Sequence, residues 1–187
     1  MLSNPSDREV IERVLEGDTE AFGLLVDRYQ DSLAAYAKYM TGNLDEAEDI
    51  VQESFVRAFK ALRKCKDRDR FSGWLFRIVS NQCKTHLARR KRRKEEPLAS
   101  AAQQADLGRA EQQAEAEELR RKVHEALQRI PADQREALVL RYVHGMSLAE
   151  MTELLATTVP ALKMRLLRGR QNLRSILAEM GIHDTGT

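Results

Sequence analysis

Apolar residues recur along most of this chain at the three- and four-residue spacing of amphipathic helices. The clearest run extends from about Asp18 to Met40, with apolar positions at Phe22, Leu25, Val26, Tyr29, Leu33 and Tyr36. Alternating Val, Ile, Thr and Tyr runs, which would indicate strands, do not occur, and glycine and proline fall between the periodic segments. The pattern therefore predicts an all-α protein.

Two more helices are predicted in the first half of the chain. One begins behind Asn43, a favourable N-cap residue, and runs to about Leu62. Its core-facing positions are Ala47, Ile50, Val51, Phe55 and Leu62. The other is the stretch Phe71–Lys94, with Ser72 as its expected cap and with Leu75, Ile78, Val79 and Gln82 toward the core.

Residues 95–107 are rich in Glu, Pro, Ala, Ser and Gln and offer little apolar surface to offset the entropy cost of ordering. Helical periodicity resumes near Arg109 and is strong from Leu119 to Ile130. We therefore expect two small helical domains, residues 1–94 and 119–187, joined by a flexible linker over residues 95–118.

The second domain carries the pattern of a helix-turn-helix. A helix over Asp133–Val143 should end at Gly145, and Ser147 with Glu150 forms a capping box for a short helix. A turn at residues 156–158 follows. Thr158 then caps a longer helix whose apolar stripe is Leu162, Leu166, Leu173 and Leu177.

Charge is strongly segregated although the 187-residue chain has a net charge of only +2. Residues 45–53 contain acids and no bases, whereas residues 84–94 and 163–174 contain bases and no acids. Such blocks are typical of a protein that meets two partners of opposite sign.

Several classes of function are disfavoured. No apolar run is long enough to cross a membrane and the polar N-terminus is no signal peptide, so we expect a cytoplasmic protein with free thiols at Cys65 and Cys83. Cys83 and His86 alone are a weak basis for a metal site. The four histidines are scattered and no phosphate-binding loop occurs, so we expect neither enzyme activity nor a cofactor or small-molecule substrate.

The charged blocks suggest three surfaces. Asp45, Glu46, Asp49, Gln52 and Glu53 form an outward polar face that repels DNA and suits a basic protein. Trp74, Arg77, Asn81 and Lys84 share the exposed side of the helix over 71–94, where an aromatic can stack on an unpaired base. Lys163, Arg170 and Arg174 flank one side of the last apolar stripe, and Arg165 and Arg168 flank the other. The plainer alternatives are core packing of Trp74 and solvated basic helix faces.

Three stretches carry a family resemblance: DEAEDIVQESFVRAF (45–59), FSGWLFRIVSNQCKTHLARRKRR (71–93) and residues 130–174. They resemble bacterial sigma factors of the extracytoplasmic function (ECF) type, in the sigma-70 family. The resemblance implies a subunit that binds core RNA polymerase and directs promoter-specific initiation. It also implies control by an anti-sigma factor, a protein that covers the polymerase-binding surfaces.

The resemblance further implies roles for individual residues. Docking on the β′ coiled coil of the polymerase would use Asp45, Glu46, Asp49, Gln52 and Glu53. Recognition and opening of the −10 promoter element would use Lys64, Arg70, Trp74, Arg77, Asn81, Lys84, Arg89 and Arg90. The C-terminal domain would sit on the β flap and read the −35 element through Thr158, Lys163, Arg165, Arg168 and Arg170.

This chain also departs from the family pattern. Thr85 stands where many members have Asp, Ala156 where the turn often has Gly, and Met164 where Ser is usual. Alanine is expected to tolerate the turn, and Pro160 fits a first helical turn. Promoter preference should differ, because Pro160, Ala161 and Met164 offer no side-chain hydrogen bonds to bases. The alternative of a stand-alone helix-turn-helix regulator gives the acidic helix no use.

Overall fold

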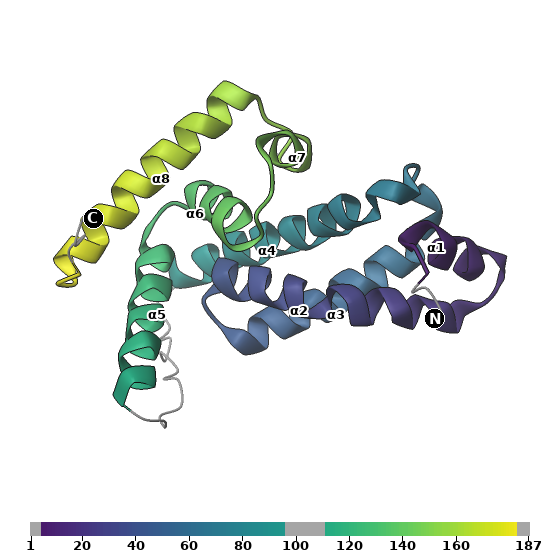
Figure 1. The fold of residues 1–187 in the computed structure, drawn as a ribbon, viewed down its shortest axis with the longest axis horizontal. Coiled ribbons are helices and arrows are strands. Elements are labelled where there is room, and N and C mark those ends of the chain that lie inside the picture. Colours follow the sequence, from purple (N-terminus) through teal and green to yellow (C-terminus); the bar gives the residue numbers. More distant parts are fainter. Residues whose placement is uncertain (1–4, 96–110, 183–187) are drawn as a thin grey trace.

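The computed structural model describes residues 5–95 and 111–182, which are almost entirely helical (Figure 1). The helices are α1 (Asp7–Glu16), α2 (Phe22–Thr41), α3 (Leu44–Lys60), α4 (Phe71–Glu95), α5 (Glu111–Arg129), α6 (Ala132–Leu138), α7 (Leu148–Leu154) and α8 (Val159–Glu179). Three 3₁₀ turns (Thr19–Ala21, Leu62–Lys64, Arg68–Arg70) and one π-helical turn (Val139–Val143) join them. No strand occurs within these ranges, so the predicted all-α class is confirmed.

The N-terminal domain is a bundle of α2, α3 and α4, with α1 packed across the end where α4 begins (Figure 1). Its core is formed by the apolar stripes that the sequence predicts: Leu25, Leu33, Ile50, Phe55, Leu75 and Val79 are all buried. Phe22 meets Phe55 and Phe59 edge to face, which closes one end of the bundle.

Local capping explains where several helices begin and end. The Asn43 side chain accepts a hydrogen bond from the Glu46 amide (3.0 Å) at the start of α3, and Thr158 caps α8 in the same way. Ser147 and Glu150 form the predicted capping box of α7, and Gly145 takes the left-handed conformation (φ 65°).

Four details differ from the sequence prediction. Helix α4 begins at Phe71 directly after a 3₁₀ turn, so Ser72 lies inside the helix and does not cap it. Helix α1 was not predicted, although Ser6 and Glu9 form a capping box at its start. Helix α5 begins within the range assigned to the linker, and residues 96–110 of that range lie outside the described residues. The predicted helix over Asp133–Val143 divides into α6 and the π-helical turn.

The C-terminal domain packs α6 and α7 against α8, with Met151, Leu162 and Leu166 in its core. Helix α8 crosses α6 closely at Gly169. A Cβ added at Gly169 would lie 3.2 Å from Leu138 Cγ and 3.3 Å from the Gln134 carbonyl oxygen. The missing side chain thus permits the close crossing that fixes the angle of α8 in the helix-turn-helix.

The two domains are in contact. The C-terminal domain lies against α2 and α4 through α5, α6 and α7, and α8 lies on the far side of α6 (Figure 1). As a result α4 is buried along two stripes: Leu75 and Val79 belong to the bundle core, whereas Phe76 and Ser80 lie on the stripe beside them. The sequence predicts one buried face for α4, and in the structure a second face of this helix is also buried.

The turn of the helix-turn-helix contains a strained residue. Ala156 has φ 47°, which places a non-glycine residue in the left-handed region. The turn forms with alanine, although the Cβ of Ala156 costs about 1–2 kcal/mol in that conformation. The glycine that the family often has at this position carries no such cost.

We predict that Ala156→Gly raises the free energy of unfolding by up to about 1 kcal/mol, because relief of the left-handed strain exceeds the added entropy of the unfolded chain. Ala149→Gly, the same substitution at an exposed position in α7, should lower it by about 1 kcal/mol. Urea denaturation of both variants checks the pair, and equal shifts of one sign would contradict it.

Candidate nucleic-acid interface

The exposed side of α4 and the preceding turn bring together the residues predicted to meet the −10 element. Lys64, Arg70, Arg77, Asn81 and Lys84 are all exposed along this surface. The arrangement follows from helical geometry, because residues 77, 81 and 84 recur at three- and four-residue spacing. These side chains present cations and one amide, which suits a phosphate backbone and base edges.

Trp74 is packed on one side and open on the other. The ring packs on Phe71 with a centroid separation of 5.8 Å, so part of it fills the bundle end. The side chain is nevertheless only half-buried, and it lines an open cleft of ≈ 810 Å³ together with Arg70, Arg77 and the α7 residues Ala149 and Glu153. A ring held by packing on one side and open on the other is suited to stacking.

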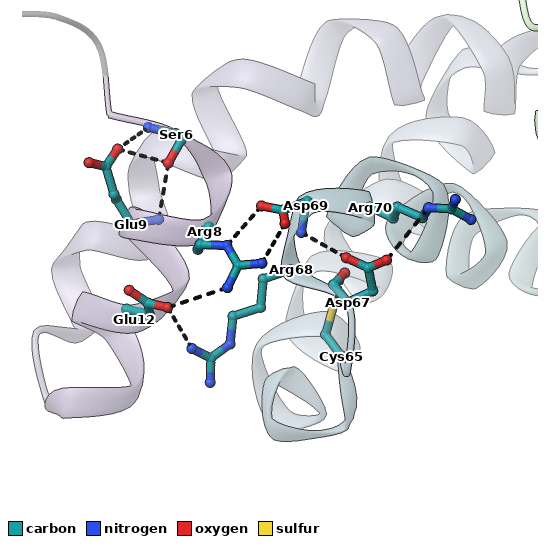
Figure 2. Close-up of polar contacts among 9 residues, drawn as sticks. All are labelled: Ser6, Arg8, Glu9, Glu12, Cys65, Asp67, Arg68, Asp69 and Arg70. Atoms are coloured by element: carbon teal, nitrogen blue, oxygen red, sulfur yellow. Dashed lines mark hydrogen bonds and ion pairs between the residues drawn. The ribbon is translucent and has the colours of Figure 1, made fainter.

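An ion-pair network holds the turn before α4 against α1 (Figure 2). Arg8 makes a bidentate contact with Asp69, and Arg68 Nη1 lies 2.9 Å from Glu12 Oε1. Hydrogen bonding with Asp69 raises the pKa of Arg8, and the same bond lowers the pKa of Asp69, so both groups remain charged. Within the turn, the Asp67 carboxylate accepts from the Asp69 amide (3.2 Å). Sequence analysis missed this brace because it joins residues about sixty positions apart.

The basic end of α4 is only partly open. Arg89 is exposed, whereas Arg90 Nη1 donates to the Thr41 carbonyl (2.9 Å) and lies 3.4 Å from Glu46 Oε2. His86 Nε2 is also 3.0 Å from that carboxylate oxygen. Arg90 therefore ties α4 to the α2–α3 turn in addition to any outward role.

The acidic face of α3 points away from the bundle core. Asp45, Asp49, Gln52 and Glu53 are exposed, and no cation lies within 4.0 Å of the first two among the described residues. Glu53 pairs with Arg57 one turn later, and that hydrogen bond lowers the pKa of Glu53. Glu46 is the exception on this face because it is half-buried against α4.

The helix-turn-helix leaves its basic flanks outward. Lys163, Arg168 and Arg170 are exposed on α8, and Thr158 stands at its exposed N-terminus. Arg165 is half-buried, with Nε 3.7 Å from Asp133 Oδ2. Val159, Met164 and Leu167 are also partly exposed on this helix, which adds apolar surface to the cationic flanks.

Three residues that the sequence analysis did not select lie where the domains meet: Glu136, His144 and Glu153. Their sequence context is that of ordinary helix-surface or loop residues, and only the tertiary packing places them on α2 and α4. His144 Nδ1 lies 3.4 Å from Ser32 Oγ, and its ring meets Tyr36 and Phe76 edge to face at 5.9 and 5.3 Å.

The parts of the chain that the structure describes contain no group of three His, Cys, Asp or Glu side chains arranged to hold a metal ion. They also contain no helix long and apolar enough to cross a membrane. Cys65 and Cys83 are both free thiols and buried. Burial raises the pKa of the Cys83 thiol to about 12, so it is unreactive in this setting.

A helical bundle with an acidic face and a basic helix, followed by a helix-turn-helix, defines a two-domain DNA-binding protein. The family pattern "Sigma-70 region 2" matches residues 25–93, and "Sigma-70, region 4" matches residues 120–173. The chain belongs to the sigma-70 family, in its ECF group. Members of this family are transcription initiation factors and not enzymes.

Individual relatives agree with this assignment along the whole chain. The RNA polymerase sigma-H factor of Pseudomonas aeruginosa is 31% identical over 95% of this chain and 96% of its own length. The ECF RNA polymerase sigma-E factor of Haemophilus influenzae is 31% identical over 94% and 97%. A solved complex of CnrH with the cytosolic domain of CnrY is similar at 30% identity, with a TM-score of 0.68 over 94% of this chain and 99% of that one.

We predict that the contact between the domains weakens as the pH falls from about 7.5 to 5.5, because separation lets His144 regain its ordinary pKa of about 6.5. Burial lowers the pKa of His144 in the closed arrangement, and its Nε2 is buried without a hydrogen-bond partner in the described residues. Below a pH of about 6.5 the separated form takes up a proton at His144 more readily than the closed form does. The stability that neutral His144 gives to the domain contact is therefore present above this pH and is lost as the pH falls.

The groups facing the ring do not oppose this trend. Ser32, Tyr36 and Phe76 surround it, and burial raises the pKa of Tyr36 well above its ordinary value. His124, whose ring is tilted against Tyr39 of α2 at 5.6 Å, has a pKa lowered by burial and then by Lys38, and its protonation therefore favours separation as well. The radius of gyration from solution scattering should rise toward acid pH, and by less in His144→Phe. A constant or falling radius would exclude the effect.

Proposed function

We propose that this sigma factor docks on core RNA polymerase, at the β′ coiled coil, through the acidic face of α3. The observation that carries the proposal is the exposure of Asp45, Asp49 and Gln52 on a helix whose other side is bundle core. Within the described residues Asp45 and Asp49 have no ion-pair partner, so the face keeps its charge for an outside surface. Glu53 and the half-buried Glu46 extend the same face.

For the −10 element we propose that α4 holds the opened strand. Trp74 supplies a stacking surface, Asn81 a base-edge donor and acceptor, and Arg77, Lys84 and Arg89 supply phosphate contacts. Lys64 and Arg70 extend the cationic surface along the turn that α1 braces. Unstacking a base costs a few kcal/mol, and such a surface can offset that cost by binding the strand after it opens.

For the −35 element we propose that α8 enters the major groove of duplex DNA, with the C-terminal domain seated on the β flap. Lys163 with Arg170 and Arg165 with Arg168 lie on opposite flanks of the apolar stripe, so each flank faces one phosphate wall. Met164 and Thr158 lie toward the N-terminal part of α8, where base edges are reached. The paucity of side-chain donors there favours recognition of DNA shape.

We further infer that the protein works in the cytoplasm and is held inactive by an anti-sigma factor. CnrH, which shares this fold, is solved in complex with the cytosolic domain of another protein, CnrY. The partly exposed apolar residues Leu44, Val56 and Phe59 on α3 offer such a regulator a surface next to the acidic face. Co-purification from cells would identify this partner.

We predict that Asp49→Lys lowers the affinity for core polymerase at least about fivefold, because it reverses a charge in the proposed interface. Glu20→Lys makes the same charge change at an exposed site at the other end of the bundle and should leave the affinity unchanged. Fluorescence anisotropy with labelled sigma factor measures both. An unaltered Asp49→Lys affinity, with the fold intact by circular dichroism, would remove this face from the interface.

We predict that Lys163→Ala, Arg168→Ala and Arg170→Ala each reduce the salt dependence of duplex promoter binding by about one unit of slope, because each removes one phosphate contact. Arg121→Ala, on the exposed side of α5, is the matched control and should not change the slope. The measurement is a titration of holoenzyme on duplex DNA at several salt concentrations. Unchanged slopes in all three variants would count against the assigned flanks.

A further inference from the structure

Acidic residues of the C-terminal domain occupy the basic side of α4. Arg70 Nη1 lies 2.9 and 2.8 Å from the two carboxylate oxygens of Glu153, and Arg77 donates to the Glu153 backbone carbonyl. Further along α4, Lys84 Nζ is 2.9 Å from Glu136 Oε2. These contacts engage three of the cations that we assign to the −10 strand.

The Glu136 carboxylate is the centre of this contact. It is 1% exposed, and its Oε1 accepts hydrogen bonds from Tyr36 Oη (2.9 Å) and Ser80 Oγ (2.5 Å), while Oε2 faces Lys84. The partners come from α2 and α4, and Glu136 comes from α6, so every one of these bonds crosses between the domains. Burial of a carboxylate is costly unless the carboxylate is paired in this way. The three partners on α2 and α4 therefore form a pocket that fits the Glu136 side chain.

Apolar and hydrogen-bonded contacts seal the surroundings of this carboxylate. The His144 ring packs edge to face on Tyr36 and on Phe76, and these two rings also meet each other at a centroid separation of 5.8 Å. On the opposite side Gln128 Nε2 donates to the Tyr39 carbonyl (2.7 Å). The Lys84 side chain is itself 46% exposed, so the Lys84–Glu136 pair lies at the rim of this contact and only its carboxylate is removed from water.

We propose that the C-terminal domain is an intramolecular competitor of promoter DNA for the basic side of α4, with Glu136 as the latch. The proposal rests on the assignment of α4 to the −10 strand and goes beyond it. Phosphate groups and these two glutamates require the same cations, so the strand cannot bind until the domains separate. The affinity for the strand is then reduced by the fraction of molecules that are open.

The masking is selective. Asp49 on α3 and Lys163, Arg168 and Arg170 on α8 remain exposed in the closed arrangement. In the described residues none of these groups has an ion pair across the domains, whereas Arg70 and Lys84 of the −10 surface pair with Glu153 and Glu136. The latch therefore limits capture of an unpaired strand, and it leaves the earlier encounters with polymerase and duplex DNA unhindered.

The test compares latch variants of the full-length protein. Glu136→Gln keeps the shape and an acceptor for the two hydroxyls, but it removes the negative charge that pairs with Lys84. Glu153→Lys is the second variant; this residue is exposed on α7, so the change repels Arg70 with little risk to the fold. Glu125→Gln, which removes one exposed acid from α5 away from the interface, is the control for net charge.

Two measurements are made on each variant. Opening is followed by the radius of gyration and by the emission of Trp74, which is the only tryptophan of the sequence and lines the cleft between the domains. Binding is measured by anisotropy with a labelled single-stranded 12-mer of mixed sequence. We expect both latch variants to be more open and to bind the strand about five- to tenfold more tightly, with the control unchanged.

Other outcomes overturn the proposal and are separable from failure of the proposed function. The proposal falls if the latch variants stay compact, or if they open without tighter binding. In the second case Arg77→Ala is added to the Glu153→Lys background. A drop in strand affinity would retain α4 as a DNA surface and reject only the competition, whereas no drop would reject both assignments.

Discussion

A single carboxylate removed from water determines how the two halves of this sigma factor meet. Glu136 has a hydroxyl from α2, a hydroxyl from α4 and an ammonium group within hydrogen-bonding distance, and none of these belongs to its own domain. Removing a carboxylate from water without partners costs several kcal/mol. The closed arrangement is therefore tied to this group of side chains, and other relative positions of the domains would require Glu136 to be hydrated again.

The same constraint explains why α4 has two buried sides. A helix of a bundle needs one apolar stripe, and Leu75 and Val79 provide it. Phe76 and Ser80 form a second stripe, on which Phe76 meets both Tyr36 of α2 and His144 of the C-terminal domain, and Ser80 donates to Glu136. The C-terminal domain covers this second stripe, and the basic residues at its margin are drawn into the contact. Packing and charge thus act on one helix in the same direction.

Much of the fold could be predicted from the sequence because its determinants are local. Caps such as Asn43 and Ser147 act within one helical turn, and apolar periodicity identifies the core faces of α2, α3 and α8. Helix α1 had an equally local signal in Ser6 and Glu9 and was overlooked. The candidate residues were likewise placed on exposed faces by helical spacing alone, and their roles stay predictions.

The contacts between domains could not be predicted from these signals. Glu136 lies in the stretch ADQREAL, where the pattern predicts that a polar residue lies on the helix surface. The pattern places its partner Tyr36 in the core instead. The acidic and basic segments are also less separate in space than in the sequence, because Arg90 of the basic segment approaches Glu46 of the acidic segment within the same domain. Contacts across about a hundred residues have no periodicity, so sequence pattern alone cannot pair them.

Cys83 lies on α4 between the two buried stripes, where it is fully covered and its thiol pKa is raised to about 12. The causes are burial and then the nearby charge of Glu136, and the second of these comes from the C-terminal domain. The rate at which an added reagent alkylates this thiol therefore reports how often the protein exposes Cys83, because a covered thiol with a raised pKa does not react.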